Sequence, residues 1–179
     1  MEIYLIRHTT PLIDKGICYG QSDLAVGNDF EKDSNEIIKS LPLRIDAVYS
    51  SPLLRCKALA EKIISSSDQL SNYIIDERLI EINFGKWEMK KWCEISHEEF
   101  KAWEKDVVLN PVPGGESFSE LNERVNSFLQ DLSKNNFQAV VIVTHSGVIR
   151  SMLSLINKIS LIDTLNITVE YGAINRLEV

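Results

Sequence analysis

The sequence predicts an α/β fold in which a mostly parallel sheet is covered by helices on both faces. Residues 3–6 and 139–143 form continuous apolar runs, which is typical of strands buried on both faces. Segments with helical spacing of apolar residues lie between the expected strands, and this alternation favours parallel connections. No repeat, low-complexity segment or linker marks a boundary, so we expect a single domain over residues 1–179.

The first half of the chain is expected to alternate strands and helices. A helix with sparse apolar positions is predicted over 30–41. Ser50, Ser51 and Pro52 have the form of a helix start, because serine accepts bonds from free amides and proline fits the first helical position. The strands are predicted at 3–6, 47–49 and 73–75. The second helix would bury a face made of Leu53, Leu54, Ala58, Ala60, Ile63 and Ile64.

The second half is expected to begin with a loop and to continue the alternation. Ser117 and Glu120 have the spacing of a capping box, which predicts the start of a helix whose apolar positions continue to Leu132. The loop contains Glu81, Phe84, Gly85 and Trp87. Further elements are predicted as a helix over 96–104, a strand over 139–143, a helix that continues through Leu155 and a last strand over 173–177.

Composition excludes several classes of protein. A net charge of −7 argues against a nucleic-acid-binding surface, because such surfaces need many lysines and arginines. No apolar stretch reaches the roughly 20 residues of a membrane helix, and no basic-then-apolar leader is present, so we expect a cytoplasmic protein with no membrane partner. Cys18, Cys56 and Cys93 show no paired spacing, and we expect reduced thiols that are buried or half-buried.

Histidines and arginines lie where predicted strands end. Arg7 and His8 follow the first strand, His145 follows the strand over 139–143, and Arg55 lies early in the helix after the second strand. Ligands of parallel sheets bind at the carboxyl ends of the strands. If these strands are neighbours, the four side chains meet beside helix N-termini and form a phosphate site.

Other chemistries find no support in the sequence. His8, His97 and His145 are far apart and show no ligand spacing, so no metal is expected. No cysteine is followed six positions later by arginine, as a cysteine phosphatase would require. No phosphate-binding glycine loop or serine elbow is present either, which leaves a histidine as the candidate nucleophile.

Four ordered motifs, LIRHTT, SSPLLRCKALA, LIEINFGKWE and VVIVTHSGVIR, resemble the histidine phosphatase superfamily, which has a phosphoglycerate mutase-like three-layer sandwich. This resemblance implies that His8 is the phosphorylated nucleophile and that Arg7, Arg55 and His145 hold the phosphoryl oxygens. It also implies that Glu81 is the proton donor. We further expect Ser146, next to His145, to bind substrate.

These roles agree with elementary chemistry. Neutral imidazole is a good nucleophile near pH 7, and a phosphohistidine divides one displacement into two easier ones. Arg7 and Arg55 would stabilise the charge of the transferring phosphoryl group, so no cofactor is required. Glu81 would protonate the leaving alkoxide and later deprotonate the attacking water, provided that it is partly removed from solvent.

The loop RHTTPLIDKGICYGQSDL resembles the alpha-ribazole phosphatases of cobalamin biosynthesis. This resemblance implies that the substrate is a small nucleoside-like phosphomonoester, either alpha-ribazole 5'-phosphate or adenosylcobalamin 5'-phosphate. Tyr19 would offer it an aromatic face and a hydroxyl. Three positions depart from the family pattern. Many members have Ser or Thr at the position of Pro11 and Asn at the position of Asp14, and a glycine that is common after Trp-Glu in relatives does not follow Trp87-Glu88 here.

Three alternatives remain open at the level of the sequence. The first is a phosphatase of broad specificity for small molecules or sugar phosphates. The second is a phosphoglycerate mutase, although the short chain leaves little material for a lid and favours hydrolysis. The third is a non-catalytic relative that binds phosphorylated ligands. The sequence gives no indication of an oligomeric state.

Overall fold

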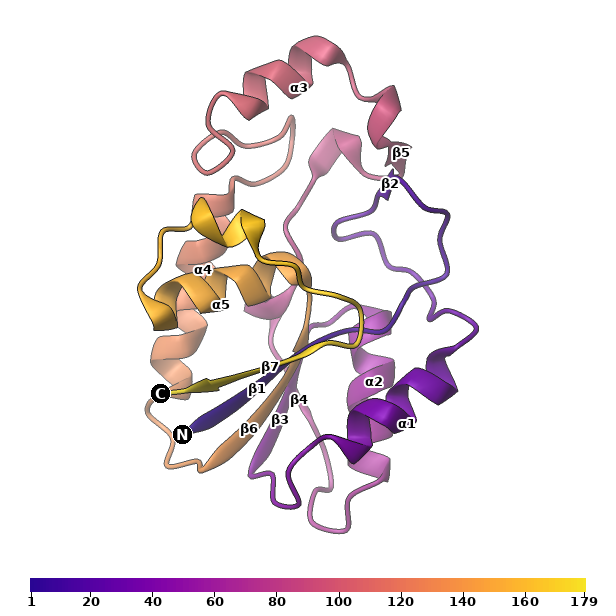
Figure 1. The fold of residues 1–179 in the computed structure, drawn as a ribbon, viewed down its shortest axis with the longest axis vertical. Coiled ribbons are helices and arrows are strands. Elements are labelled where there is room, and N and C mark those ends of the chain that lie inside the picture. Colours follow the sequence, from indigo (N-terminus) through magenta and orange to yellow (C-terminus); the bar gives the residue numbers. More distant parts are fainter.

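A five-stranded sheet forms the centre of the computed structural model, which describes residues 1–179. The strand order is β4-β3-β6-β1-β7 (Figure 1). The first four strands are parallel, and β7 runs antiparallel to β1 at the edge. The bounds are Glu2–Arg7 for β1, Ala47–Ser50 for β3, Ile74–Ile75 for β4, Ala139–Thr144 for β6 and Ile174–Glu178 for β7.

Helices cover both faces of this sheet, which makes three layers. Helices α1 (Phe30–Lys39) and α2 (Leu54–Ser65) cover one face, whereas α4 (Phe118–Leu132) and α5 (Ser146–Asn157) cover the other (Figure 1). Alternate residues of β1 supply the two cores: Ile3 and Leu5 pack under α4 and α5, while Tyr4 and Ile6 pack under α1 and α2. The predicted fold class is therefore confirmed.

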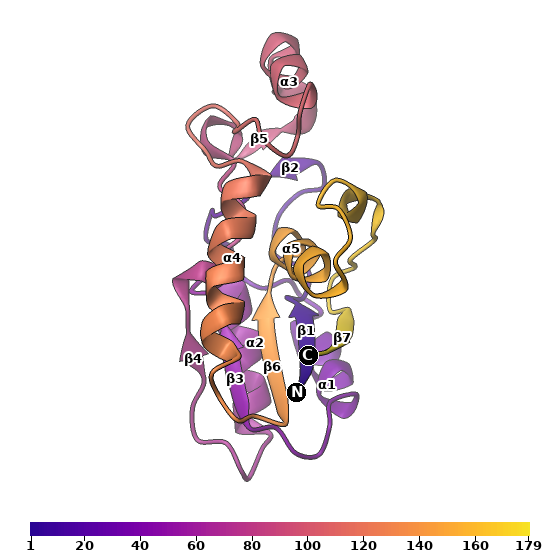
Figure 2. The same cartoon turned by 90° about the vertical axis from the view of Figure 1, so that its left-hand side faces the viewer.

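A smaller lobe stands beyond the carboxyl ends of the strands (Figures 1 and 2). It contains helix α3 (His97–Glu104) and a two-stranded antiparallel pair, β2 (Ile17–Cys18) with β5 (Lys90–Lys91). Its core is aromatic: Trp87 is fully buried, stacks on Phe100 and meets Trp103 edge-on. The Trp87 indole N–H donates to Glu99 at 3.0 Å. The sequence did not predict this strand pair.

Most predicted elements are confirmed, with shifts of one or two residues at their ends. The capping box is also present: the Ser117 hydroxyl accepts from the Glu120 amide, and the Glu120 carboxylate accepts from the Ser117 amide. The predicted third strand is the short edge strand β4, and the helix predicted over 30–41 ends at Lys39. No helix combines the length and the apolar character needed to cross a membrane.

The predicted start of α2 is wrong. The helix begins at Leu54, and the Asp23 carboxylate from a distant loop accepts the Leu54 amide at 2.7 Å. The Ser51 hydroxyl accepts the amide of Leu53, which precedes the helix, at 3.4 Å and lies 2.7 Å from the His145 ring. Of the predicted apolar face, Leu53, Ala60 and Ile63 are buried, whereas Leu54 is 45% exposed. The buried positions are Arg55, Cys56, Leu59, Ala60 and Ile63.

The expectation for the three cysteines is correct for two of them. Cys18 and Cys56 are buried, and burial raises the pKa of the Cys18 thiol to about 12. Cys93 is exposed, contrary to the prediction. It lies in a 3₁₀ turn (Trp92–Glu94) of the small lobe, and all three residues of this turn are exposed.

Candidate active site

The carboxyl ends of β1, β6 and β3 lie side by side and bring the predicted residues together. His8 directly follows β1, His145 directly follows β6, and Arg55 lies in the first turn of α2 after β3. The His8 and His145 rings meet edge-on with their centroids 5.0 Å apart. The Arg55 Nε lies 3.3 Å from the His8 Nε2. Neighbouring parallel strands therefore assemble residues that are up to 137 positions apart by strand pairing alone.

Backbone contacts define the protonation of His8. Its Nδ1 lies 2.7 Å from the carbonyl oxygen of Thr9, and because a carbonyl only accepts, Nδ1 carries the hydrogen. Nε2 then holds the lone pair and faces the Arg55 guanidinium. Burial, followed by the charges of Arg55 and Arg7, holds the pKa of His8 well below its usual 6.5. The imidazole is therefore neutral near pH 7, with a basic nitrogen directed into the cluster.

Arg55 is completely buried and held in one orientation. One terminal nitrogen donates to the carbonyl of Ser22 and the other to the carbonyl of Gly20, both at 2.8 Å. Each terminal nitrogen has a second N–H beyond the one used here. The loop that contains Gly20 and Ser22 thus orients the guanidinium while Nε faces His8.

Arg7 is held by the last loop of the chain. It donates to the carbonyl of Val169 at 2.6 Å, and its guanidinium carbon lies 3.7 Å from the ring centroid of Tyr171. The Tyr171 hydroxyl is 2.8 Å from the Tyr19 hydroxyl, and the Tyr171 ring lies 5.5 Å from the His8 ring. Burial and this contact raise the pKa of Tyr19. The Arg7 Nε is buried without a protein acceptor.

His145 contacts the His8 ring edge-on and is fully buried. Its Nε2 is 2.7 Å from the Ser51 hydroxyl and 3.4 Å from the Cys56 sulfur. Burial, followed by the charges of His8 and Arg55, holds the pKa of His145 well below its usual value. The neighbouring hydroxyl therefore orients a neutral ring.

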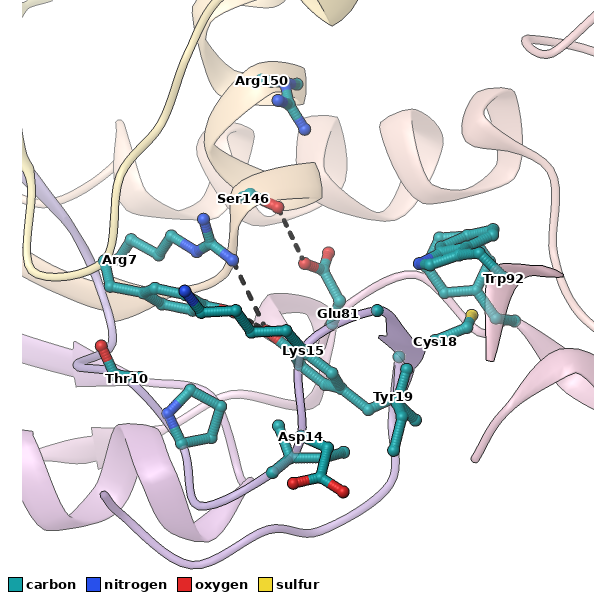
Figure 3. Close-up of a pocket in the computed structure, with 17 residues that line it drawn as sticks. Arg7, Thr10, Asp14, Lys15, Cys18, Tyr19, Glu81, Trp92, Ser146 and Arg150 are labelled. Atoms are coloured by element: carbon teal, nitrogen blue, oxygen red, sulfur yellow. Dashed lines mark hydrogen bonds between the residues drawn. The ribbon is translucent and has the colours of Figure 1, made fainter. Parts of the chain in front are cut away.

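Glu81 lies against the first turn of α5 and is 8% exposed. Its Oε1 accepts the amides of Ile82 at 3.0 Å and Gly147 at 3.1 Å, and its Oε2 accepts from the Ser146 hydroxyl at 3.3 Å (Figure 3). A helix N-terminus stabilises a carboxylate in this position. A side chain at Gly147 would collide with the Glu81 carboxylate, so the glycine allows the close approach. Arg124 donates to the Glu81 carbonyl at 3.1 Å and anchors the loop.

A pocket of about 570 Å³ opens beside this cluster. Four of the predicted site residues contribute to its wall: Arg7, Tyr19, Glu81 and Ser146 (Figure 3). The other three, His8, Arg55 and His145, are buried next to it. Pro11 and Asp14, which depart from the family pattern, are also part of the wall, so these two differences change the lining of the pocket.

Sequence reasoning missed several residues of this site. Tyr171 lies in a loop before β7, and no motif marks it. Ser51 was predicted only as part of a helix start, and no role was predicted for Asp23. Arg150 also contributes to the pocket wall and is part of the motif VVIVTHSGVIR. Its position four residues after Ser146 puts both residues on the same face of the helix, and this spacing could have identified it. No group of three or more His, Cys, Asp or Glu side chains is placed to hold a metal ion.

Comparisons with known proteins show which proteins this chain resembles. The model of the histidine phosphatase superfamily (branch 1) matches residues 3–179. A putative phosphoserine phosphatase 2 of Hydrogenobacter thermophilus is 31% identical over 98% of this chain and 88% of its own. The adenosylcobalamin/alpha-ribazole phosphatase of Salmonella typhimurium is 27% identical over 100% of this chain and 91% of its own. The crystal structure of the alpha-ribazole phosphatase from Shigella flexneri superposes with a TM-score of 0.90 at 24% identity, covering 100% and 91% of the two chains, and shows the same fold.

Proposed function

This chain belongs to the histidine phosphatase superfamily and is a phosphatase of small phosphorylated substrates, and on that premise we propose that it hydrolyses phosphomonoesters through a phosphohistidine at His8. The observation that carries the proposal is the tautomer of His8: the Thr9 carbonyl holds the hydrogen on Nδ1, so the lone pair of Nε2 faces Arg55. A neutral nucleophile beside two guanidinium groups is what phosphoryl transfer requires in the absence of a metal.

In the first step, His8 Nε2 attacks phosphorus and the bond to the leaving oxygen breaks. Glu81 gives its proton to that oxygen, which departs as the alcohol. Arg7, Arg55 and His145 hold the three remaining phosphoryl oxygens, whose charge they stabilise. The buried Arg7 Nε, which has no acceptor in the protein, supports a role in holding phosphate.

In the second step, water attacks phosphohistidine on the face that the alcohol has left. The Glu81 carboxylate takes a proton from the water, the phosphorus–nitrogen bond breaks, and the electron pair returns to His8 Nε2. Inorganic phosphate leaves and Glu81 is again protonated. Ser146 is proposed to assist by binding substrate, since its hydroxyl lies on the pocket wall next to Glu81.

We propose alpha-ribazole 5'-phosphate, or adenosylcobalamin 5'-phosphate, as the substrate, which assigns the protein to cobalamin biosynthesis. Aromatic side chains on the pocket wall support a nucleoside-like leaving group: Tyr19, Phe84, Trp92 and Tyr171. The Salmonella relative, whose name includes this substrate, and the motif around Tyr19 support the same choice.

Phosphoserine is the second candidate. The Hydrogenobacter relative named a putative phosphoserine phosphatase is 31% identical to this chain. The pocket wall also offers both signs of charge to a zwitterionic amino acid, with Lys15 and Arg150 for a carboxylate and Asp14 for an ammonium group. A phosphatase of broad specificity would accept both compounds at similar rates.

Two measurements test the proposal. His8→Ala should abolish turnover with the fold intact, and quenched wild-type enzyme should contain an acid-labile, base-stable phosphoryl group; near-normal hydrolysis by the variant would remove His8 as the nucleophile. The substrate is tested by kcat/KM for alpha-ribazole 5'-phosphate, phosphoserine and 3-phosphoglycerate. We expect the first to exceed the others by at least about 100-fold. Similar values for all three would overturn the assignment to cobalamin biosynthesis.

A further inference from the structure

A second, more apolar cavity adjoins the pocket on the α5 side of Glu81. It has a volume of about 150 Å³. Its apolar walls come from six side chains: Ile82, Phe84, Trp103, Val107, Phe118 and Leu165. Glu81, Phe84, Ser146 and Arg150 contribute to the walls of both cavities, so the two are adjacent.

Segments that are distant in the sequence build this cavity. Trp103 and Val107 belong to the small lobe, Phe118 begins α4, and Leu165 lies in a 3₁₀ turn (Asp163–Asn166) near the end of the chain. Figure 1 shows the last two segments beside α5, on the side of the sheet from which the small lobe extends. Trp103 packs edge-on against the buried Trp87, which anchors this wall to the core of the small lobe.

The position of Glu81 connects this cavity to the reaction. In the proposed function, on which this inference rests, Glu81 protonates the leaving oxygen. That oxygen must therefore lie within hydrogen-bond distance of a carboxylate that contributes to the walls of both cavities. Whatever is attached to the leaving oxygen can extend away from His8 into the apolar cavity.

The chemistry of the walls selects what fits. Apolar cavities of about 150 Å³ bind a single aromatic ring such as benzene. Arg150 lies at the junction, where its Nε and one terminal nitrogen donate to the Ile167 carbonyl at 3.2 and 3.1 Å. The remaining terminal nitrogen is free to contact a ligand, and guanidinium groups pack well against aromatic faces. We propose that this cavity binds an aromatic ring carried by the leaving alcohol, and thus selects ring-bearing primary alkyl phosphates over small ones.

The test compares two substrates with the same kind of leaving oxygen. Ethyl phosphate and 2-phenylethyl phosphate are both esters of primary alcohols, so they make similar demands on Glu81 and differ by the ring. We expect kcat/KM of the wild type to be at least about tenfold higher for the phenylethyl ester. Leu165→Trp and Val107→Phe fill the cavity from two different segments of the chain, and each should reduce this preference about tenfold while changing the rate with ethyl phosphate less than about twofold.

Ile162→Trp is the matched control, because Ile162 is an exposed apolar residue close to Leu165 that contributes no wall to the cavity. It should leave the preference unchanged. Equal losses on both substrates, or an unchanged preference in both filling variants, would overturn the inference. This test is separate from those of the proposed function. If Leu165→Trp removes a ring preference, the result supports ring binding in the cavity even if alpha-ribazole 5'-phosphate is a poor substrate. Loss of all activity in His8→Ala tests only the nucleophile.

Discussion

Replacing Glu81 by Gln isolates its proton from its structural contacts. Glutamine retains an oxygen at the position of Oε1, which accepts the amides of Ile82 at 3.0 Å and Gly147 at 3.1 Å. The contacts of Oε2, with the Ser146 hydroxyl and the Gly147 amide, are longer at 3.3 Å. Loss of a negative charge at a helix N-terminus costs about 0.3–1 kcal/mol. We therefore expect the free energy of unfolding of Glu81→Gln to change by less than about 1 kcal/mol.

The expected loss of activity is much larger and depends on the leaving group. General acid catalysis contributes about 100- to 10,000-fold, which corresponds to about 2.7–5.4 kcal/mol of barrier. An alkoxide requires this proton, so phosphoryl transfer from 2-phenylethyl phosphate should slow by at least about 100-fold. A nitrophenolate leaves with little help, and transfer from 4-nitrophenyl phosphate should slow less than about fivefold. Hydrolysis of the phosphohistidine should also slow, because the same residue activates water.

The assay is single-turnover rapid quench with enzyme in excess, in which formation and decay of labelled phosphohistidine are followed separately. With 4-nitrophenyl phosphate, the variant should accumulate phosphohistidine. Equal slowing of formation with both substrates would refute the assignment of Glu81 as the acid. Attention would then move to Asp14, which contributes to the pocket wall and is tested by Asp14→Asn. Glu88 and Glu116 are less suitable, because Ser22 and Arg124 already occupy their carboxylates at 2.6 and 2.7 Å.

Three further predictions follow from the site. Gly147→Ala should push the Glu81 carboxylate away from α5 and reproduce the dependence of Glu81→Gln on the leaving group; unchanged rates with alkyl phosphates would show that the close approach has no function. Because burial lowers the pKa of His8 and His145, the unfolded chain binds protons below about pH 6.5 that the folded chain does not. Stability should therefore fall with pH below 6.5 until the folded pKa values are reached, by up to about 1.4 kcal/mol per pH unit for each ring. Urea unfolding between pH 7.5 and 5.5 checks this, and His8→Asn should reduce the slope. Activity should survive chelators and be inhibited by vanadate, since guanidinium groups stabilise the transferring phosphoryl charge; rescue of a chelator-inactivated enzyme by zinc or magnesium would contradict this.

Several features of the fold and the site could be predicted from local sequence. The run over 139–143 is apolar at every position, and a strand of this kind can only be buried on both faces of a sheet. His8 and His145 directly follow such strands, so their meeting at one edge required only that β1 and β6 be neighbours. The capping box of Ser117 and Glu120 was predictable because its two partners are only three residues apart in the sequence.

The start of α2 shows where local reasoning fails. Ser50, Ser51 and Pro52 carry the local signal of a helix start, but the Leu54 amide is bound by Asp23, which is 31 residues away in the chain. A carboxylate brought in by the fold thus takes the role that a nearby serine would have played, and Ser51 becomes a partner of His145. Nothing in the neighbouring sequence distinguishes these two outcomes.

The sequence by itself determined the types of the main elements, the strand-end positions of His8 and His145 and the family, since each depends on residues within a few positions of one another. Only the tertiary structure decided the contact of Arg55 with the His8 Nε2, the contact of Tyr171 with Arg7 and the apolar cavity beside Glu81. These features join side chains from loops and lobes far apart in the chain. Such contacts depend on how completed layers pack, because close-packed side chains interact only over a few ångströms and sequence separation carries no information about that distance.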